Sequence, residues 1–171
     1  MHIFRDSGGE LKTFLSDEAL PEIGEVWHGR RVDVLSLDMG KGLRFNVNEV
    51  LLEGHPAIAK LAHSENYIRQ MENETVAYWH LTENQDPDNP RRAQIPRPPN
   101  QNGRIMGYLL EKLEGARAGP DDLPQCEELL RRVHTIGLVH GDVNRHNFIV
   151  DRVGGKRVRL VDFECAYDFD D

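Results

Sequence analysis

Alternating apolar and polar residues mark three short segments in the first half of the chain. Their period of two is typical of strands with one buried face, and segments with glycine or proline separate them. The strands are predicted at residues 31–37, 44–52 and 57–62, with turns at 38–42 and 53–56. Three neighbouring strands joined by short turns predict an antiparallel meander.

A helical repeat of apolar residues follows these strands. Ser64 is the predicted N-cap of a helix that runs to about Leu81. One face of this helix carries Tyr67, Met71, Tyr78 and Leu81. Glu74 falls on the same face, and a carboxylate within an apolar stripe requires a cationic or hydrogen-bonding partner. The pattern therefore predicts such a partner for Glu74.

A second helix is predicted in the last third of the chain. Asp121 or Asp122 caps its start, and Gly137 ends it. Its apolar face consists of Leu123, Cys126, Leu129, Leu130, Val133 and Ile136. This helix leads the chain directly to His140.

Two short apolar segments near the C-terminus predict a β-hairpin. Residues 148–150 and 158–161 are the expected strands, and residues 151–156 contain the glycines of a turn. A hairpin brings the residue before its first strand and the residue after its second strand to the same end. Asn147 and Asp162 are therefore predicted to lie at one end of the hairpin.

The predicted elements divide an α+β chain into three parts. The parts are a polar lead-in at residues 1–30, a sheet with one helix at 31–111, and a hinge with a smaller helical and hairpin part at 112–171. The lead-in is expected to hold a short helix near residues 17–20. The middle part is expected to hold an exposed proline-rich loop at 86–100 and a further strand at 104–110.

Composition limits the classes of partner. The chain has 171 residues, of which 39% are hydrophobic, enough for a core in one or two small lobes. The net charge of -8 disfavours non-specific binding to nucleic acid or to anionic membranes. Cys126 and Cys165 form neither a disulfide framework nor a metal-ligand spacing, which fits a reducing, cytoplasmic setting. The sequence contains no apolar run of membrane-spanning length and no signal-peptide pattern at its N-terminus.

The candidate chemistry lies in H-G-D-V-N-R-H-N, residues 140–147, followed by V-D-F-E, residues 161–164. Asp142 would accept a proton from an attacking hydroxyl group or orient that group. Asn147 and Asp162 offer oxygen donors, which suit Mg²⁺. This spacing is typical of ATP-dependent phosphotransferases. The alternative interpretation is a polar loop capped by Asp and Asn, followed by an acidic strand end.

At these residues the chain resembles the protein-kinase-like superfamily. The pattern H-G-D-x-x-x-x-N followed by D-F-E is most similar to its small-molecule branch, which includes choline kinases, aminoglycoside phosphotransferases and related fungal kinase-like proteins. The resemblance covers about residues 31–166. It implies a two-lobed kinase-like fold, with an antiparallel-sheet N-lobe and an abbreviated C-lobe, and it implies ATP and Mg²⁺ as cofactors.

The resemblance also assigns roles to residues outside the two motifs. Lys60, in A-I-A-K, would neutralise nucleotide phosphates and pair with Glu74, with Glu72 as the second choice. Taken alone, Lys60 would be interpreted as a solvated strand lysine. Glu111 and Leu113 would lie in the hinge, where the backbone binds adenine.

Four further positions modify this expectation. Gly40 and Gly42 would form a reduced phosphate-covering loop, although an ordinary hairpin turn explains them as well. Gly141 replaces an arginine that anchors a phosphorylated activation loop in many protein kinases, so that form of regulation is not expected. Glu164 replaces the glycine of D-F-G, and the resemblance implies that its carboxylate approaches a second metal ion.

Kinase-like enzymes continue into further helices, whereas this chain ends nine residues after Asp162. Under the resemblance, three alternatives are expected: a minimal enzyme, a C-terminally truncated one, or a remnant that binds nucleotide. The first predicted function is transfer of the γ-phosphate of ATP to a hydroxyl of a small molecule or protein. The alternative is a non-catalytic kinase-like module that binds nucleotide or a protein partner. A third interpretation is an adaptor that docks to a protein partner through the proline-rich loop.

Overall fold

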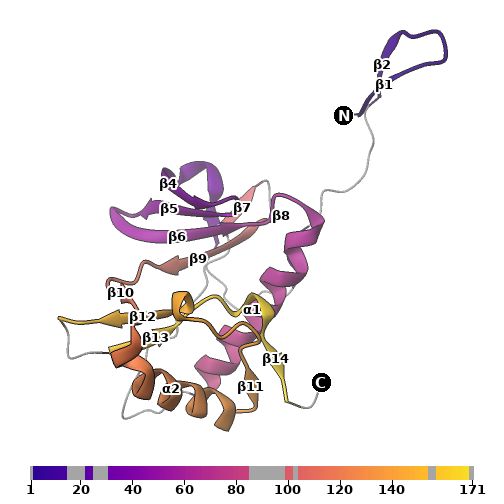
Figure 1. Cartoon of the computed structure of the whole chain (residues 1–171). Coiled ribbons are helices and arrows are strands. Elements are labelled where there is room, and N and C mark those ends of the chain that lie inside the picture. The colour runs from indigo at the N-terminus through magenta and orange to yellow at the C-terminus, as the bar shows by residue number, and fades with distance from the viewer. Residues whose placement is uncertain are drawn as a thin grey trace.

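In the part of the chain that it describes, a computed structural model has two α-helices and mostly antiparallel strands, which is the predicted α+β class (Figure 1). The described residues are 2–14, 22–24, 31–84, 99–101, 104–153 and 157–169. The predicted short helix at 17–20 and most of the proline-rich loop at 86–100 lie outside these ranges. Among the described helices, none is long and apolar enough to cross a membrane.

A four-stranded antiparallel sheet forms the first half of the structure. Its strands, in spatial order, are β4 (Asp38–Arg44), β5 (Val47–Leu52), β6 (His55–Leu61) and β9 (Gly107–Glu111). Each neighbouring pair is antiparallel, so the predicted meander is confirmed. The apolar residues of one sheet face pack together as a core of Val50, Ala57, Ala59, Leu61 and Leu109 beside Leu37.

The predicted position of the first strand was wrong. Within 31–37 only Val32–Asp33 (β3) forms a strand, and a 3-10 turn at Val34–Ser36 follows it. The Asp33 side chain accepts a hydrogen bond from the Leu35 backbone N–H, an alternative to strand pairing. The predicted turn at 38–42 instead lies within β4.

Gly40 and Gly42, which suggested the turn, lie instead where β4 pairs with β5. A Cβ atom on Gly40 would lie only 2.9 Å from the backbone oxygen of Glu49 on β5. The pairing of β4 with β5 also changes register between Met39 and Arg44. Glycine therefore permits a close approach of two strands here, and the actual turn comes later, at Phe45 and Asn46.

Helix α1 (Glu65–Glu83) confirms the first helical prediction, with Ser64 at its N-cap position. Met71, Glu74 and Tyr78 are all buried on the predicted face. Met71 and Tyr78 belong to a hydrophobic core that also contains Tyr108 of β9 and Phe163. Helix α1 thus connects the sheet with the segment after residue 160, against which it packs (Figure 1).

The second half of the structure contains helix α2 and the predicted hairpin. These elements are α2 (Leu123–Thr135), β10 (Ala116–Arg117), β12 (Phe148–Asp151) and β13 (Arg157–Leu160). Strands β12 and β13 pair with Phe148 opposite Leu160, which confirms the hairpin. Asp122 is the N-cap residue of α2, and Gly137 follows the helix with φ of 83°. Leu123 was wrongly assigned to the apolar face, because it is 57% exposed in the first turn.

Short strands complete the described chain. They are β1 (His2–Arg5), β2 (Leu11–Phe14), β7 (Pro99–Gln101), β8 (Arg104–Ile105), β11 (Leu138–Val139) and β14 (Tyr167–Asp168). Strands β1 and β2 form a hairpin where the sequence indicated a loose lead-in. The Asp6 side chain holds its turn by accepting bonds from the backbone N–H groups of Gly8 and Glu10. The strand predicted at 104–110 is interrupted at Met106.

Candidate functional site

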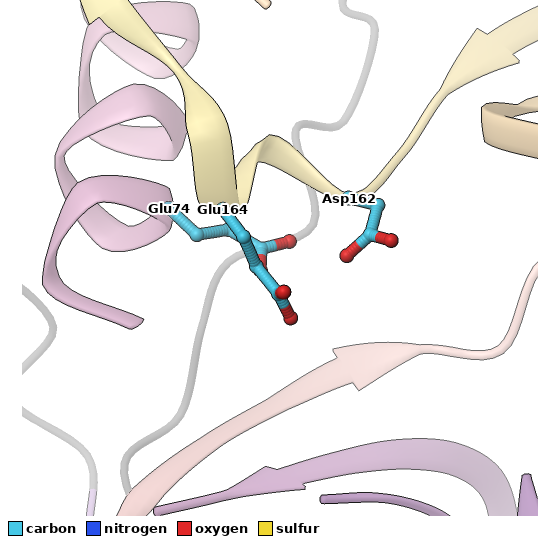
Figure 2. Close-up of side chains that lie close together, drawn as sticks. All are labelled: Glu74, Asp162 and Glu164. Atoms are coloured by element: carbon cyan, nitrogen blue, oxygen red, sulfur yellow. The ribbon is translucent and has the colours of Figure 1, made fainter. Parts of the chain in front are cut away.

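Lys60 of β6 lies at the centre of a cluster of acidic side chains. Its Nζ atom donates to Glu74 Oε2 at 2.6 Å, to Asp162 Oδ1 at 2.5 Å and to Glu164 Oε1 at 2.9 Å. Figure 2 shows the three carboxylates converging from helix α1 and from the segment after β13. Residues that are about 100 positions apart in the sequence therefore meet at one ammonium group.

Two features of the sheet place Lys60 in the interior. It lies opposite Tyr108 in the β6–β9 pairing. A side chain on Gly107, the next partner along β9, would overlap the Lys60 carbonyl oxygen, so only glycine permits this approach of the strands. Burial would lower the pKa of Lys60, but the carboxylates of Glu74, Asp162 and Glu164 raise it, and the ammonium stays charged.

Glu74 holds Lys60 from the helix side. It is 0% exposed, and its Oε2 atom accepts from Lys60 and from the Tyr108 hydroxyl. The Tyr78 hydroxyl donates to Oε1 at 3.0 Å. Burial, together with the Glu74 charge, raises the pKa of both tyrosines well above its usual value, so they stay protonated and donate. Glu72 instead accepts from the Gly24 N–H, and Glu74 is the ion-pair partner that was expected from the helical face.

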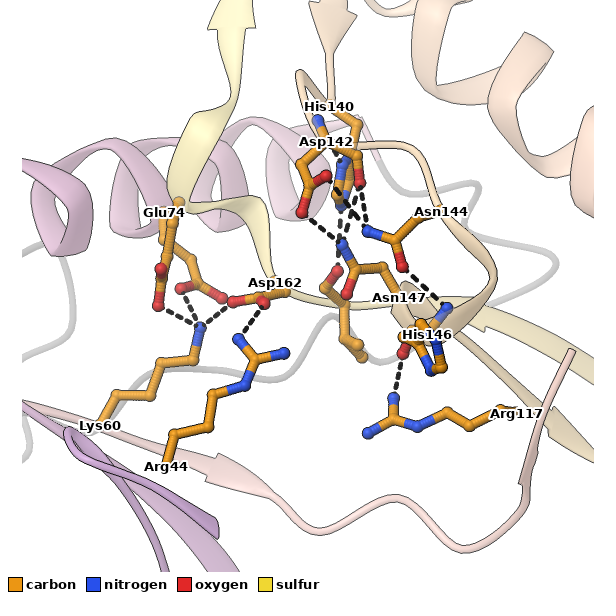
Figure 3. A network of polar contacts seen from close by, with 12 residues as sticks. Arg44, Lys60, Glu74, Arg117, His140, Asp142, Asn144, His146, Asn147 and Asp162 are labelled. Carbon is orange, nitrogen blue, oxygen red and sulfur yellow. Dashed lines mark hydrogen bonds and ion pairs between the residues drawn. The ribbon is translucent and has the colours of Figure 1, made fainter.

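Asp162 occupies the end of the hairpin with a left-handed backbone, at φ of 71°. Its second oxygen, Oδ2, accepts from Arg44 Nη1 at 2.9 Å (Figure 3). Burial raises the pKa of Asp162, but Lys60 and Arg44 outweigh this effect and hold the pKa below its usual value. Burial and the neighbouring carboxylates raise the pKa of Glu164 despite its bond to Lys60. Of these two carboxylates, Asp162 therefore stays ionised more readily than Glu164.

The cluster has the chemistry of a cation site. The described carboxylates, on Glu74, Asp162 and Glu164, offer oxygen atoms within 4.8 Å of one another. They already surround one cation, the ammonium of Lys60, and with Arg44 the five groups carry one net negative charge when all are ionised. Oxygen donors and an excess of negative charge suit a hard divalent cation such as Mg²⁺. The predicted metal ligand Asp162 thus fits this ion.

His140 connects the 140–147 loop to the end of β13. The ring is fully buried, and its Nε2 atom lies 3.0 Å from the Val161 carbonyl oxygen, which can only accept a hydrogen bond. Nε2 therefore carries the proton in this tautomer, and Nδ1 accepts from the Asp142 N–H at 3.3 Å. Through these two bonds His140 braces the loop against the end of β13.

The structure explains why residue 141 is a glycine. Its φ is 75°, and a Cβ atom there would overlap the carbonyl oxygen of Cys165. The loop and the segment after Asp162 are therefore packed backbone against backbone. Sequence reasoning interpreted this glycine only as the absence of an arginine.

Asp142 and Asn147 are joined directly. Asn147 Nδ2 donates to the Asp142 carbonyl oxygen at 2.9 Å and to Oδ2 at 3.1 Å, while Asn144 Nδ2 donates to Oδ1 at 3.1 Å (Figure 3). Asp142 is exposed and Asn147 is buried. The amide nitrogen of Asn147 points to Asp142, so its amide oxygen is directed elsewhere. The Asn147 carbonyl oxygen accepts from the Val161 N–H at 2.9 Å, which places the loop beside Asp162.

The remaining predicted positions lie outside these two groups. Glu111 is the last residue of β9, opposite Ala57, and Leu113 follows it, partly buried. Their contact with adenine stays a prediction. Gly40 and Gly42 lie within β4 rather than in a loop tip, so their assignment to a turn was wrong. The sequence did not indicate Arg44 as a site residue, because a single arginine at a strand end belongs to no motif with a recognisable spacing.

No protein-family model matches the chain, and no curated protein is similar to it. Its function must therefore be argued from the geometry of the Lys60 cluster and the Asp142 loop.

Proposed function

We propose that the chain is an ATP- and Mg²⁺-dependent phosphotransferase of kinase-like, two-lobed architecture, which transfers the γ-phosphate to a hydroxyl of a small molecule or protein. One observation carries the proposal: Lys60 contacts Glu74 and Asp162 at 2.6 and 2.5 Å. The order of the sheet, helix α1, helix α2 and the hairpin adds support. The pair of Lys60 and Glu74 is the one that the kinase-like resemblance led us to expect, and Asp162, the expected metal ligand, lies against the same lysine.

In this proposal, Lys60 binds the nucleotide phosphates. Glu74 fixes the ammonium from the buried side by accepting its hydrogen bond. The hydroxyls of Tyr78 and Tyr108 in turn fix Glu74 by donating to its carboxylate. Lys60 Nζ has three donor hydrogens. It keeps its bond to the fully buried Glu74 and exchanges its bonds to Asp162 and Glu164 for phosphate oxygens.

Asp162 and Asn147 are the residues that would hold Mg²⁺, which supplies neutralisation of charge on the transferring phosphoryl group. Asp162 fits this role because its pKa is held below the usual value and the carboxylate stays ionised. Backbone groups near Glu111 and Leu113 would bind adenine.

Asp142 is the proposed catalytic base. It is exposed, which leaves it accessible to an acceptor, and the side-chain amides of Asn144 and Asn147 hold both of its oxygens. These neutral donors fix the direction of the carboxylate. Asp142 orients the acceptor hydroxyl and takes its proton as the hydroxyl oxygen bonds to the γ-phosphorus, while the bond from that phosphorus to the bridging oxygen of ATP breaks and ADP leaves.

The test compares Asp142→Ala with Asp121→Ala, which removes an exposed carboxylate from the 3-10 turn before α2. Mg·ATP affinity and ATP turnover, with water as the acceptor, are measured for both variants and the wild type. Asp142→Ala should lower turnover about 10²-fold or more and leave affinity nearly unchanged, whereas Asp121→Ala should alter neither. A wild type that does not bind Mg·ATP would contradict the proposal.

A non-catalytic nucleotide-binding module is the second candidate. It is favoured by the hairpin tip between β4 and β5, where Phe45 and Asn46 replace the glycines that usually cover phosphates. In that case the wild type binds Mg·ATP but shows no turnover, and Asp142→Ala changes nothing. The same two measurements therefore separate the candidates.

A further inference from the structure

The β4–β5 hairpin brings an arginine, rather than glycine, to the acidic cluster. Arg44 is the last residue of β4, and the two-residue turn that follows consists of Phe45 and Asn46. In the described chain this hairpin tip offers no glycine backbone for wrapping a phosphate group. The donor that the tip presents to a phosphate group is instead the side chain of Arg44.

Contacts on both sides of the tip fix the position of Arg44. The Asn46 carbonyl oxygen accepts from the Leu61 N–H at 2.9 Å, and the Asn46 side chain is buried. The Phe45 ring lies 5.6 Å from the His63 ring and 6.0 Å from the Tyr67 ring, measured between centroids. The tip is thereby held at the end of β6 and the start of α1, and Arg44 extends from a defined backbone.

Arg44 reaches a residue 118 positions away, where Nη1 donates to Asp162 Oδ2 at 2.9 Å. Its side chain is 58% exposed, in contrast to the buried Lys60 on the other oxygen. Exposed ion pairs contribute little to stability and exchange readily for another partner. The Arg44 bond is therefore the weaker of the two that engage Asp162.

We infer that Arg44 binds the phosphates of a nucleoside di- or triphosphate and, without nucleotide, pairs with Asp162 in their place. This inference rests on the proposed function. A guanidinium group matches phosphate oxygens through two parallel N–H donors, and it remains charged throughout the physiological pH range. When Asp162 binds a metal ion, Arg44 loses its carboxylate partner. The guanidinium group then lies close to the phosphates that Lys60 would bind, because Arg44 and Lys60 contact the two oxygens of the same carboxylate.

The test measures the affinities of the full chain for ATP and adenosine in the presence of Mg²⁺. The variants are Arg44→Ala, Arg44→Lys and the control Lys41→Ala, which removes an exposed cation from the same strand. Arg44→Ala should lower the ratio of ATP affinity to adenosine affinity about tenfold, because a charge-assisted hydrogen bond to phosphate is lost. Arg44→Lys should give an intermediate ratio, and Lys41→Ala should match the wild type.

Each other outcome overturns the inference in a recognisable way. If the wild type prefers ATP and Arg44→Ala keeps that preference, Arg44 does not bind phosphate, but the proposed function stands. If Arg44→Ala weakens ATP and adenosine equally, its role is structural. If the wild type binds no ATP, the inference and the proposed function fail together.

Discussion

The two polar groups of the site are held in opposite ways. Around Lys60, charged side chains of both signs contact one another, and the lysine and Glu74 are buried. Around Asp142, neutral amides hold a single exposed carboxylate. The comparison shows two ways of placing charges: the first group buries charges of both signs in contact with one another, whereas the second keeps one carboxylate fixed in direction and exposed.

The largest expected effect comes from removing the central cation. Lys60→Met leaves Glu74, Asp162 and Glu164 facing one another, and loss of one partner of a buried ion pair destabilises by about 3–5 kcal/mol. Denaturant unfolding of the full chain measures this change. The control Lys41→Met, at an exposed position of β4, should stay within about 0.5 kcal/mol of wild type.

A loss below about 1 kcal/mol in Lys60→Met would indicate that the cluster behaves as an exposed ion pair. The contrast between the buried and the open group would then be wrong.

The next effect tests how the Asp142 loop is fixed. Gly141→Ala should destabilise more than Gly137→Ala, although both glycines have positive φ. A Cβ at Gly141 overlaps the Cys165 carbonyl oxygen, whereas a Cβ at Gly137 meets nothing within 4 Å. Strain from φ alone is about 1–2 kcal/mol, and unfolding experiments should give Gly141→Ala a further loss from this overlap. Equal losses in the two variants would mean that the loop can move away from Cys165.

A smaller effect measures the coupling within the buried group. Lys60→Met and Glu74→Gln should give non-additive losses of nucleotide affinity, with a coupling of about 0.5–3 kcal/mol in a double-mutant cycle. The physical reason is their 2.6 Å ion pair. The control is a second cycle that pairs Lys60→Met with Glu72→Gln. Glu72 accepts from the Gly24 N–H and not from Lys60, so the affinity losses of these two substitutions should be additive.

The sequence predicted those parts of the site that depend on local period. The helical repeat placed Glu74 on the same face as Met71 and Tyr78, and a carboxylate there required a partner. The turn signal between two apolar segments predicted the hairpin, and the hairpin brought Asn147 and the residue before Asp162 into contact. Each of these inferences required only neighbouring residues.

Features that depend on distant packing were not predictable. Gly40 indicated a turn but lies in β4, because its role is to admit the backbone of β5. Arg44 meets Asp162 only after the sheet, α1 and the hairpin have assembled. The left-handed backbone of Asp162 likewise has no signal in the sequence, because aspartate adopts positive φ more often than most residues but only at a minority of its positions.

The most direct test of the central claim is the effect of Mg²⁺ on ATP affinity in Asp162→Asn. The substitution preserves shape but removes the charge that would bind the metal ion. Wild type should bind ATP more tightly with Mg²⁺ than without it, and Asp162→Asn should lose this difference while keeping its far-UV circular dichroism spectrum. A full Mg²⁺ effect in Asp162→Asn would contradict the assignment of Asp162 as the metal ligand.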